Sequence, residues 1–172
     1  MITAICPGSF DPVTIGHLDI ISRAYKIFDK VIVAVSVNPQ KLSAFSVEER
    51  VQLLKIAVKD AGLEVEITPM TGLLAYYAKE RNATVVVKGL RAMTDFEYEF
   101  QMALTNKKLN PELETMFLAT SAENMFLSSS MVKQVAGFQG DISHFVPECI
   151  SQTIIERLSA GGKKHEQQSS DN

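Results

Sequence analysis

Residues 6–17 read CPGSFDPVTIGH, and this stretch decides how the fold begins. The apolar run at residues 2–6 stops at two prolines and a Ser-Phe-Asp turn, and helical spacing of apolar residues starts just after Gly16 and His17. A buried strand leading through a tight turn into a helix is therefore predicted. Because a helix start presents unpaired amides and a positive dipole end, the turn is a candidate phosphate site. The alternative is a plain turn in which His17 is a local cap.

The same unit recurs along the chain, as short apolar strands alternate with amphipathic helices. Strands are expected at residues 2–6, 31–37, 64–68, 84–87 and 115–119, and helices near 18–28, 46–61, 73–81 and 93–109, after Ser128 and after Pro147. This alternation predicts a Rossmann-like α/β fold, a doubly wound five-stranded parallel sheet with helices on both faces. Residues 1–160 are expected to form a single domain, and residues 161–172 a disordered polar tail.

Composition excludes several classes of protein. The 172 residues are 46% hydrophobic and carry a net charge of −3, which suits a compact domain and argues against a general nucleic-acid or anionic-membrane binder. Cys6 and Cys149 have no metal-ligand spacing, and no basic segment precedes a long apolar run at the N-terminus. No apolar run approaches the roughly 20 residues of a transmembrane helix. We therefore expect a soluble cytoplasmic protein with no membrane partner.

Three further cations follow predicted strands, Lys41 after the second and Lys88 and Arg91 after the fourth. Because loops beyond parallel strands share one edge of the sheet, these cations are expected to surround a polyanion together with His17. Residues 128–130 (SSS) begin a helix and offer a second set of amides and hydroxyls. The alternatives are solvated surface cations and ordinary serine N-caps. Neither GxxxxGK[ST] nor GxGxxG occurs, so a different nucleotide site is needed.

The residues of these loops resemble a known family. Residues 14–17 (TIGH) and 128–133 (SSSMVK) resemble the paired (H/T)xGH and Ser-Ser-Ser/Thr-x-x-Lys/Arg signatures of nucleotidylyltransferases. Residues 88–103 (KGLRAMTDFEYEFQMA) and 106–118 (NKKLNPELETMFL) resemble the bacterial phosphopantetheine adenylyltransferases in particular. The similarity covers about residues 1–158.

The resemblance implies transfer of adenylate from ATP to 4′-phosphopantetheine, giving dephospho-coenzyme A and pyrophosphate in coenzyme A biosynthesis, by an enzyme that is usually a homohexamer. It implies that His17 stabilises the transition state and that Lys41 and Arg91 are catalytic. It assigns ATP to Ser9, Phe10, His17, Gly89, Leu90, Arg91, Glu99, Asn124, Met125, Phe126, Leu127, Ser128, Ser129 and Ser130, and the acceptor to Ser9, Lys41, Leu74 and Lys88. No protein-held metal is expected, because magnesium would arrive bound to the ATP phosphates.

The chain departs from the family pattern at three positions. Lys88 stands where arginine is common, Ile15 where asparagine is frequent and Gly72 where an acidic residue often appears. An ammonium at residue 88 keeps the charge but loses the planar two-point grip of a guanidinium. Two other functions remain open. One is an adenylyl- or cytidylyltransferase with another phosphorylated acceptor, such as nicotinamide mononucleotide or glycerol phosphate, and the other is a non-catalytic nucleotide sensor.

Overall fold

The computed structural model describes residues 1–37, 42–91 and 93–166, with the backbone alone at 93–95 and 160–166. Lys41, one of the predicted site residues, lies outside the described residues. The elements in chain order are β1 (Thr3–Gly8), α1 (Ile15–Ile27), β2 (Lys30–Ser36), α2 (Val47–Asp60), β3 (Glu66–Met70), α3 (Leu74–Glu80), β4 (Val85–Leu90), α4 (Met93–Leu109), β5 (Glu114–Ala119), the 3-10 turn η1 (Ala122–Asn124), α5 (Ser129–Gly137) and α6 (Glu148–Glu166).

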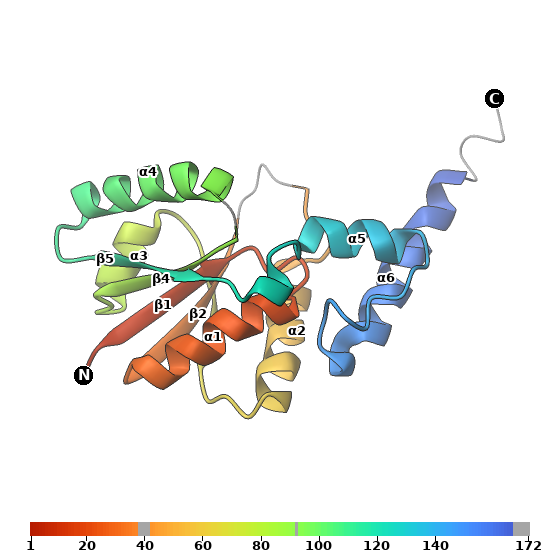
Figure 1. Ribbon diagram of the computed structural model, residues 1–172, viewed down its shortest axis with the longest axis horizontal. Helices are drawn as coiled ribbons and strands as arrows, with labels where there is room; N and C mark the ends of the chain where they lie inside the picture. The colour runs from red at the N-terminus through yellow and green to blue at the C-terminus, as the bar shows by residue number, and fades with distance from the viewer. Residues whose placement is uncertain (38–41, 92, 167–172) are drawn as a thin grey trace.

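The five strands form one parallel sheet in the order β3-β2-β1-β4-β5, as predicted for a doubly wound fold. The chain first winds outward through β2 and β3 and then returns to the other side of β1, which makes β1 and β4 the point where the order reverses. Helices α3 and α4 lie over one face of the sheet and α1 and α2 over the other, while α5 and α6 extend beyond the strand ends (Figure 1). Ligands bind such sheets at this reversal point.

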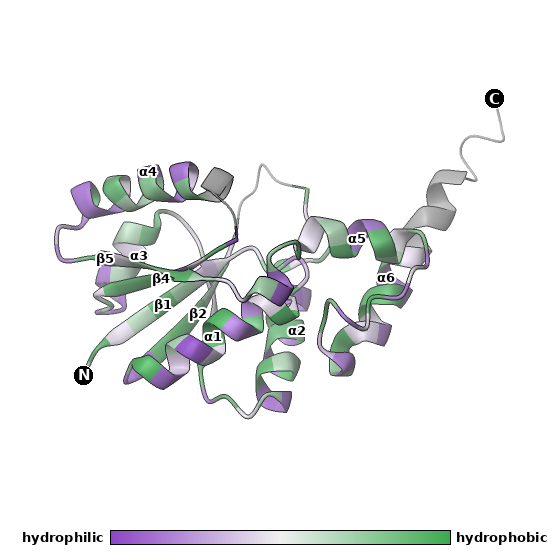
Figure 2. Cartoon of the chain, viewed as in Figure 1, coloured by the Kyte–Doolittle hydropathy of each residue, from purple (hydrophilic) through white to green (hydrophobic). Residues whose placement is uncertain are grey.

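Alternating side chains of the buried strands divide the core between the two faces. Ala4 and Cys6 of β1 pack with α1, α2, α5 and α6, whereas Ile5 between them packs with α3. The central strands are hydrophobic along most of their length, and the covering helix α1 alternates between hydrophobic and hydrophilic turns (Figure 2). Within the described residues, no helix is both long enough and apolar enough to cross a bilayer.

The ends of several elements differ from the sequence-based expectation, and two of these differences bear on the site and on the end of the domain. Strand β4 continues through Lys88 to Leu90, because Lys88 pairs with Phe117 and Leu90 with Ala119 in the ladder with β5. Lys88 therefore lies within the strand. The prediction that it follows the strand is wrong. Helix α6 continues to Glu166, beyond the boundary at residue 160 that we expected between domain and tail, and residues 167–172 lie outside the described part of the chain.

Candidate active site

A cavity of about 720 Å³ opens at the carboxyl ends of β1 and β4, where the strand order reverses. It brings together residues that are far apart in the sequence, from the first turn, β4, α4 and the start of α5. The predicted site residues that line it are Ser9, Phe10, His17, Lys88, Gly89, Arg91, Glu99, Asn124, Leu127, Ser128, Ser129 and Ser130. Three of the four predicted cationic or imidazole groups thus share one cavity.

Four of the predicted residues that the structure describes do not line this cavity. Leu74 begins α3 and packs on the core cluster at that face of the sheet. Leu90 ends β4, and Met125 and Phe126 follow η1 with 52% and 63% of their surface exposed, beside the cavity residues Asn124 and Leu127. Contacts of these four side chains with a nucleotide or acceptor remain predictions.

His17 is both a helix cap and a cavity residue. The backbone N–H of Thr14 donates to the ring nitrogen Nδ1 of His17 at 3.0 Å. The Thr14 hydroxyl oxygen accepts from the backbone N–H of His17 at 3.3 Å. Since a backbone amide can only donate, Nδ1 must accept, and the neutral ring carries its proton on Nε2. Burial and the nearby Arg91 guanidinium lower the pKa of His17 to about 4. At neutral pH the ring is therefore an uncharged N–H donor.

Phe10 is a buried residue of the first turn, between β1 and α1. Its backbone is left-handed, with φ of 48°, and its ring is 4% exposed and meets the His17 ring edge-on at a centroid distance of 5.1 Å. A Cβ on Gly8 would lie 2.9 Å from the Phe10 ring. Gly8 is thus required by the packing of Phe10.

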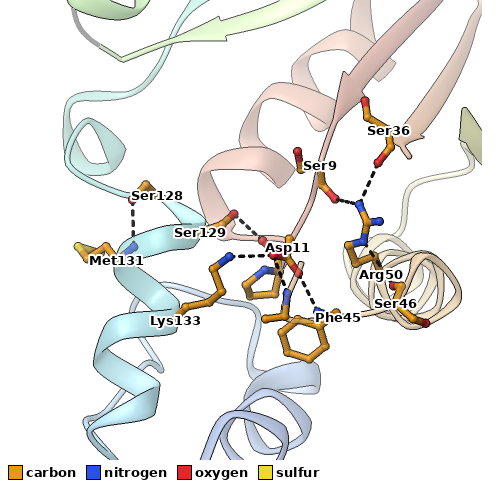
Figure 3. A network of polar contacts seen from close by, with 12 residues as sticks. Ser9, Asp11, Ser36, Phe45, Ser46, Arg50, Ser128, Ser129, Met131 and Lys133 are labelled. Atoms are coloured by element: carbon orange, nitrogen blue, oxygen red, sulfur yellow. Dashed lines mark hydrogen bonds and ion pairs between the residues drawn. The ribbon is translucent and has the colours of Figure 1, made fainter. Parts of the chain in front are cut away.

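Asp11 joins three segments around the cavity (Figure 3). Its carboxylate accepts from Lys133 Nζ at 2.8 Å and from the amides of Ala44 and Phe45 at 3.1 and 2.9 Å. Burial opposes ionisation, but the bonds from Lys133 and the two amides hold the pKa of Asp11 below its ordinary value. An ionised Asp11 therefore holds the first turn against α5 and the segment before α2.

Lys88 and Glu99 form an ion pair across the cavity wall. Lys88 Nζ lies 3.3 Å from each carboxylate oxygen of Glu99, and both side chains are about one quarter exposed, at 25% and 22%. The ammonium therefore interacts equally with both oxygens of the carboxylate. The acidic segment near the start of α4 thus brings one carboxylate into the site.

The start of α5 presents backbone amides to the cavity. The hydroxyl oxygen of Ser128 caps the helix by accepting from Met131 N–H at 3.1 Å, and the Ser129 hydroxyl donates to the Pro12 carbonyl at 2.7 Å. Arg91 Nη1 donates to the Leu127 carbonyl at 2.8 Å, which ties the end of β4 to this helix start. The N-capping interpretation is therefore correct for Ser128, and the amides of Ser129 and Ser130, which this cap does not use, are left for an anion.

Three functional candidates escaped the sequence reasoning. Asp11 and Lys133 pair across 122 positions of the chain, and Arg50 is a buried residue of α2 whose neighbours Glu48 and Glu49 make it look like part of a solvated face. The spacing of Lys133 after the three serines was a usable signal, but Arg50 had none.

The chemistry available to this arrangement is charge stabilisation. Cationic and neutral donors converge on one cavity, and burial raises the pKa of the Cys6 thiol at the cavity wall to about 12, which keeps this thiol protonated at neutral pH. A site of amides, cations and an uncharged imidazole suits phosphate groups. These features are those of a nucleotidyltransferase site on a doubly wound sheet.

Comparison with known proteins agrees with this class. A family model described as cytidylyltransferase-like matches residues 5–135. A phosphopantetheine adenylyltransferase from Caldanaerobacter subterraneus subsp. tengcongensis is 55% identical over 158 residues, 92% of this chain and 98% of the relative. Another, from Clostridium tetani, is 55% identical over 154 residues, 90% of this chain and 96% of the relative.

The chain therefore belongs to the phosphopantetheine adenylyltransferase family, within the wider cytidylyltransferase-like class, and is an enzyme. Similarity in fold extends further than similarity in sequence. The crystal structure of a Vibrio parahaemolyticus protein assigned as a nicotinate-nucleotide adenylyltransferase superposes with a TM-score of 0.65 over 94% of each chain, at 20% identity.

Proposed function

We propose that the chain transfers adenylate from ATP to 4′-phosphopantetheine, releasing dephospho-coenzyme A and pyrophosphate. The observation that carries this proposal is the identity of 55% to relatives named for that activity, over 90% or more of the chain. The cavity supports it, because His17, Lys88 and Arg91 line one volume large enough for a nucleotide.

The reaction proposed is a direct in-line displacement. A phosphate oxygen of phosphopantetheine forms a bond to the α-phosphorus of ATP as the bond from that phosphorus to the bridging oxygen of the β-phosphate breaks. The nucleophile arrives ionised, so no side chain has to remove a proton. The residues of the cavity orient two mutually repelling anions and stabilise the charge that grows on the α-phosphate and on pyrophosphate.

His17 is proposed to donate from Nε2 to the α-phosphate. Its Nδ1 is held by Thr14, so the ring cannot turn without losing that bond, and the donor is fixed before substrate arrives. A neutral donor also binds the ground state less strongly than a cation would, which leaves more of its effect for the transition state. Lys41 and Arg91 are proposed as further stabilising cations, by resemblance.

The Lys88–Glu99 pair is proposed to lie between the two substrates. By resemblance Lys88 contacts the acceptor and Glu99 contacts ATP, and the two side chains form an ion pair at 3.3 Å. The carboxylate holds the ammonium in place, and an incoming phosphate would share that ammonium with it. A lysine here forms a point contact with phosphate in place of the two-point contact of a guanidinium.

Magnesium is proposed to enter with ATP. Among the described side chains, the two carboxylates that line the cavity are both engaged, Asp11 by Lys133 and two amides and Glu99 by Lys88. These residues fit an ion held by nucleotide phosphates more readily than one held by a protein cage. When bound, the ion would neutralise phosphate charge.

We further propose a homohexamer and a cytoplasmic location. The homohexamer follows from the resemblance, and an exposed apolar surface supports subunit contact, because such surfaces usually mark interfaces. Among the described side chains of α4 and the neighbouring β5, the exposed large apolar ones are Phe96, Tyr98, Phe100, Met102, Leu104, Leu109 and Met116. The cytoplasmic location is supported by Cys6 and Cys149, both free thiols.

The test is to incubate the purified chain with ATP and magnesium, offering phosphopantetheine, nicotinamide mononucleotide or glycerol phosphate. Mass spectrometry identifies the product, and coupled release of pyrophosphate gives the rate. We expect dephospho-coenzyme A when phosphopantetheine is the acceptor, and no product with either of the other two acceptors. Turnover with another acceptor in its place would assign a different transferase activity, and nucleotide binding without any pyrophosphate would identify a sensor.

A further inference from the structure

Arg50 is a buried cation directly behind the first turn. It lies in the second turn of α2, is 3% exposed and does not line the cavity. Its Nη1 donates to the Ser9 carbonyl at 2.7 Å and to the Ser36 carbonyl at 3.0 Å, and its Nε donates to the Ser46 carbonyl at 3.3 Å (Figure 3). One guanidinium thus binds the ends of β1 and β2 to the start of α2.

The contact with Ser9 fixes the direction of a backbone amide. The peptide bond between Ser9 and Phe10 is trans, and in a trans peptide the C=O and N–H point in opposite directions. The carbonyl points at Arg50, which lies outside the cavity, whereas Ser9 and Phe10 both line it. The Phe10 N–H therefore points away from Arg50, and it belongs to a residue that itself lines the cavity.

This N–H is available to a ligand. Strand β1 ends at Gly8, and among the described residues the Phe10 N–H meets no acceptor. Gly8 at the end of β1 pairs with Val35 of β2, and the carbonyl of the next residue on β2, Ser36, accepts from Arg50. A near-buried amide without a partner is costly unless a ligand or water pairs with it.

We propose that Arg50 is a positioning residue for the nucleotide: it holds the Ser9–Phe10 peptide so that the Phe10 N–H donates to an ATP phosphate. The guanidinium also polarises that peptide, because a carbonyl bound to a cation makes the N–H of the same unit a stronger donor. This inference deepens the proposed function and rests on it for the identity of the nucleotide. Lysine at this position would keep the charge but lose the fork that reaches three carbonyls.

The test compares Arg50→Lys and Arg50→Met with the wild type, using Arg157→Lys as the matched control, since Arg157 on α6 is 54% exposed in its ion pair with Glu49. Binding of ATP without acceptor is measured by calorimetry. We expect roughly tenfold weaker binding in Arg50→Lys, roughly a hundredfold in Arg50→Met and no change in the control, as for loss of a charge-assisted donor.

A spectroscopic readout separates positioning from a general loss of stability. In protein labelled with ¹⁵N-phenylalanine, the Phe10 amide is expected to shift downfield when ATP saturates the wild type, and to shift less in Arg50→Lys at saturation. Thermal unfolding checks that Arg50→Lys is folded, and this variant decides the matter if Arg50→Met is not. Normal ATP affinity in folded Arg50→Lys, or a Phe10 amide that does not respond to ATP in the wild type, overturns the inference.

Failure of the proposed function would look different. If the Phe10 amide shifts with ATP in the wild type and Arg50→Lys binds ATP more weakly, but the wild type makes no dephospho-coenzyme A, the role of Arg50 stands and the acceptor assignment is wrong. If the wild type makes dephospho-coenzyme A while Arg50→Lys binds ATP normally, the reaction stands and the role of Arg50 is wrong.

Discussion

At the scale of single residues, His17 fits both interpretations that the sequence left open, a helix cap and a candidate phosphate donor. The cap interpretation and the phosphate interpretation were alternatives in the sequence, but the structure satisfies the first through Nδ1 and leaves Nε2 for the second. The cap fixes the tautomer, and the tautomer makes the ring a donor at the cavity. Sequence could place His17 at the helix start, but only the contact with Thr14 N–H reveals which nitrogen is free.

Removal of the His17 donor is expected to lower turnover. His17→Ala loses both nitrogens, whereas in His17→Asn the amide oxygen can replace Nδ1 as the acceptor for Thr14 N–H. Both variants should lower kcat by about 10²–10³, as for other preorganised donors. Only His17→Ala should lose about 1 kcal/mol of stability with the cap. Pyrophosphate release and urea unfolding measure the two effects, with exposed His144→Ala as control. Near-normal turnover in His17→Asn would remove Nε2 from the mechanism.

The protonation state of His17 gives a prediction for pH. Because its pKa falls from 6.5 to about 4 on folding, the unfolded chain binds the extra proton first as pH decreases. The contribution of His17 to stability is therefore fully present above pH 6.5 and is progressively lost as pH falls toward 4. Ring ¹⁵N shifts should report a neutral, Nε2-protonated imidazole from pH 8 down to about 5. Titration of this ring near pH 6.5 would contradict the burial argument.

At the scale of elements, local sequence patterns predicted most of the fold. The capping box of Ser46 and Glu49 is present at the start of α2, with Ser46 N–H donating to the Glu49 carboxylate at 2.7 Å. Helix α4 also has the predicted ends, Met93 and Leu109. The extension of β4 through Lys88 was not predictable, because the apolar run stops at Val87 and the pairing with Phe117 depends on a strand that comes later in the chain.

The closeness of α1 to β4 depends on Gly89. A Cβ at this position would lie 2.8 Å from Cγ1 and 3.1 Å from Cδ1 of Ile20, which is 8% exposed on α1. Gly89→Ala should therefore push α1 away from the sheet, with a loss of about 1–3 kcal/mol. It should also lower turnover, because α1 carries His17.

The matched control is Gly137→Ala on α5, where an added Cβ has no atom within 4 Å. Alanine in that helical position should be neutral or stabilising by about 0.5–1 kcal/mol. Urea unfolding of both variants measures the difference. Equal stabilities would show that Ile20 can move aside without cost.

At the scale of the whole molecule, topology accounts for the part of the site that sequence could predict. Parallel strands end at one edge, so His17, Lys88 and Arg91 were expected to meet, and all three line the cavity. The buried charges behind them were not predictable, since Arg50 reaches Ser9 across 41 positions of the chain and Lys133 reaches Asp11 across 122. Those contacts depend on how α2 and α5 pack against the sheet ends, which no local pattern records.

The proposed homohexamer gives a prediction about the surface of α4. Leu104 is 56% exposed within the apolar surface of α4 and β5, and it does not line the cavity. In Leu104→Glu, assembly would bury a carboxylate in an apolar contact, which costs roughly 3 kcal/mol and weakens association by about a hundredfold.

Ile56→Glu is the matched control, because Ile56 is 46% exposed on α2, across the sheet from α4. Sedimentation velocity should show hexamers for the wild type and Ile56→Glu and smaller species for Leu104→Glu. If Leu104→Glu sediments as the wild type does, subunit contact must use another surface; if the wild type is monomeric, the homohexamer is wrong.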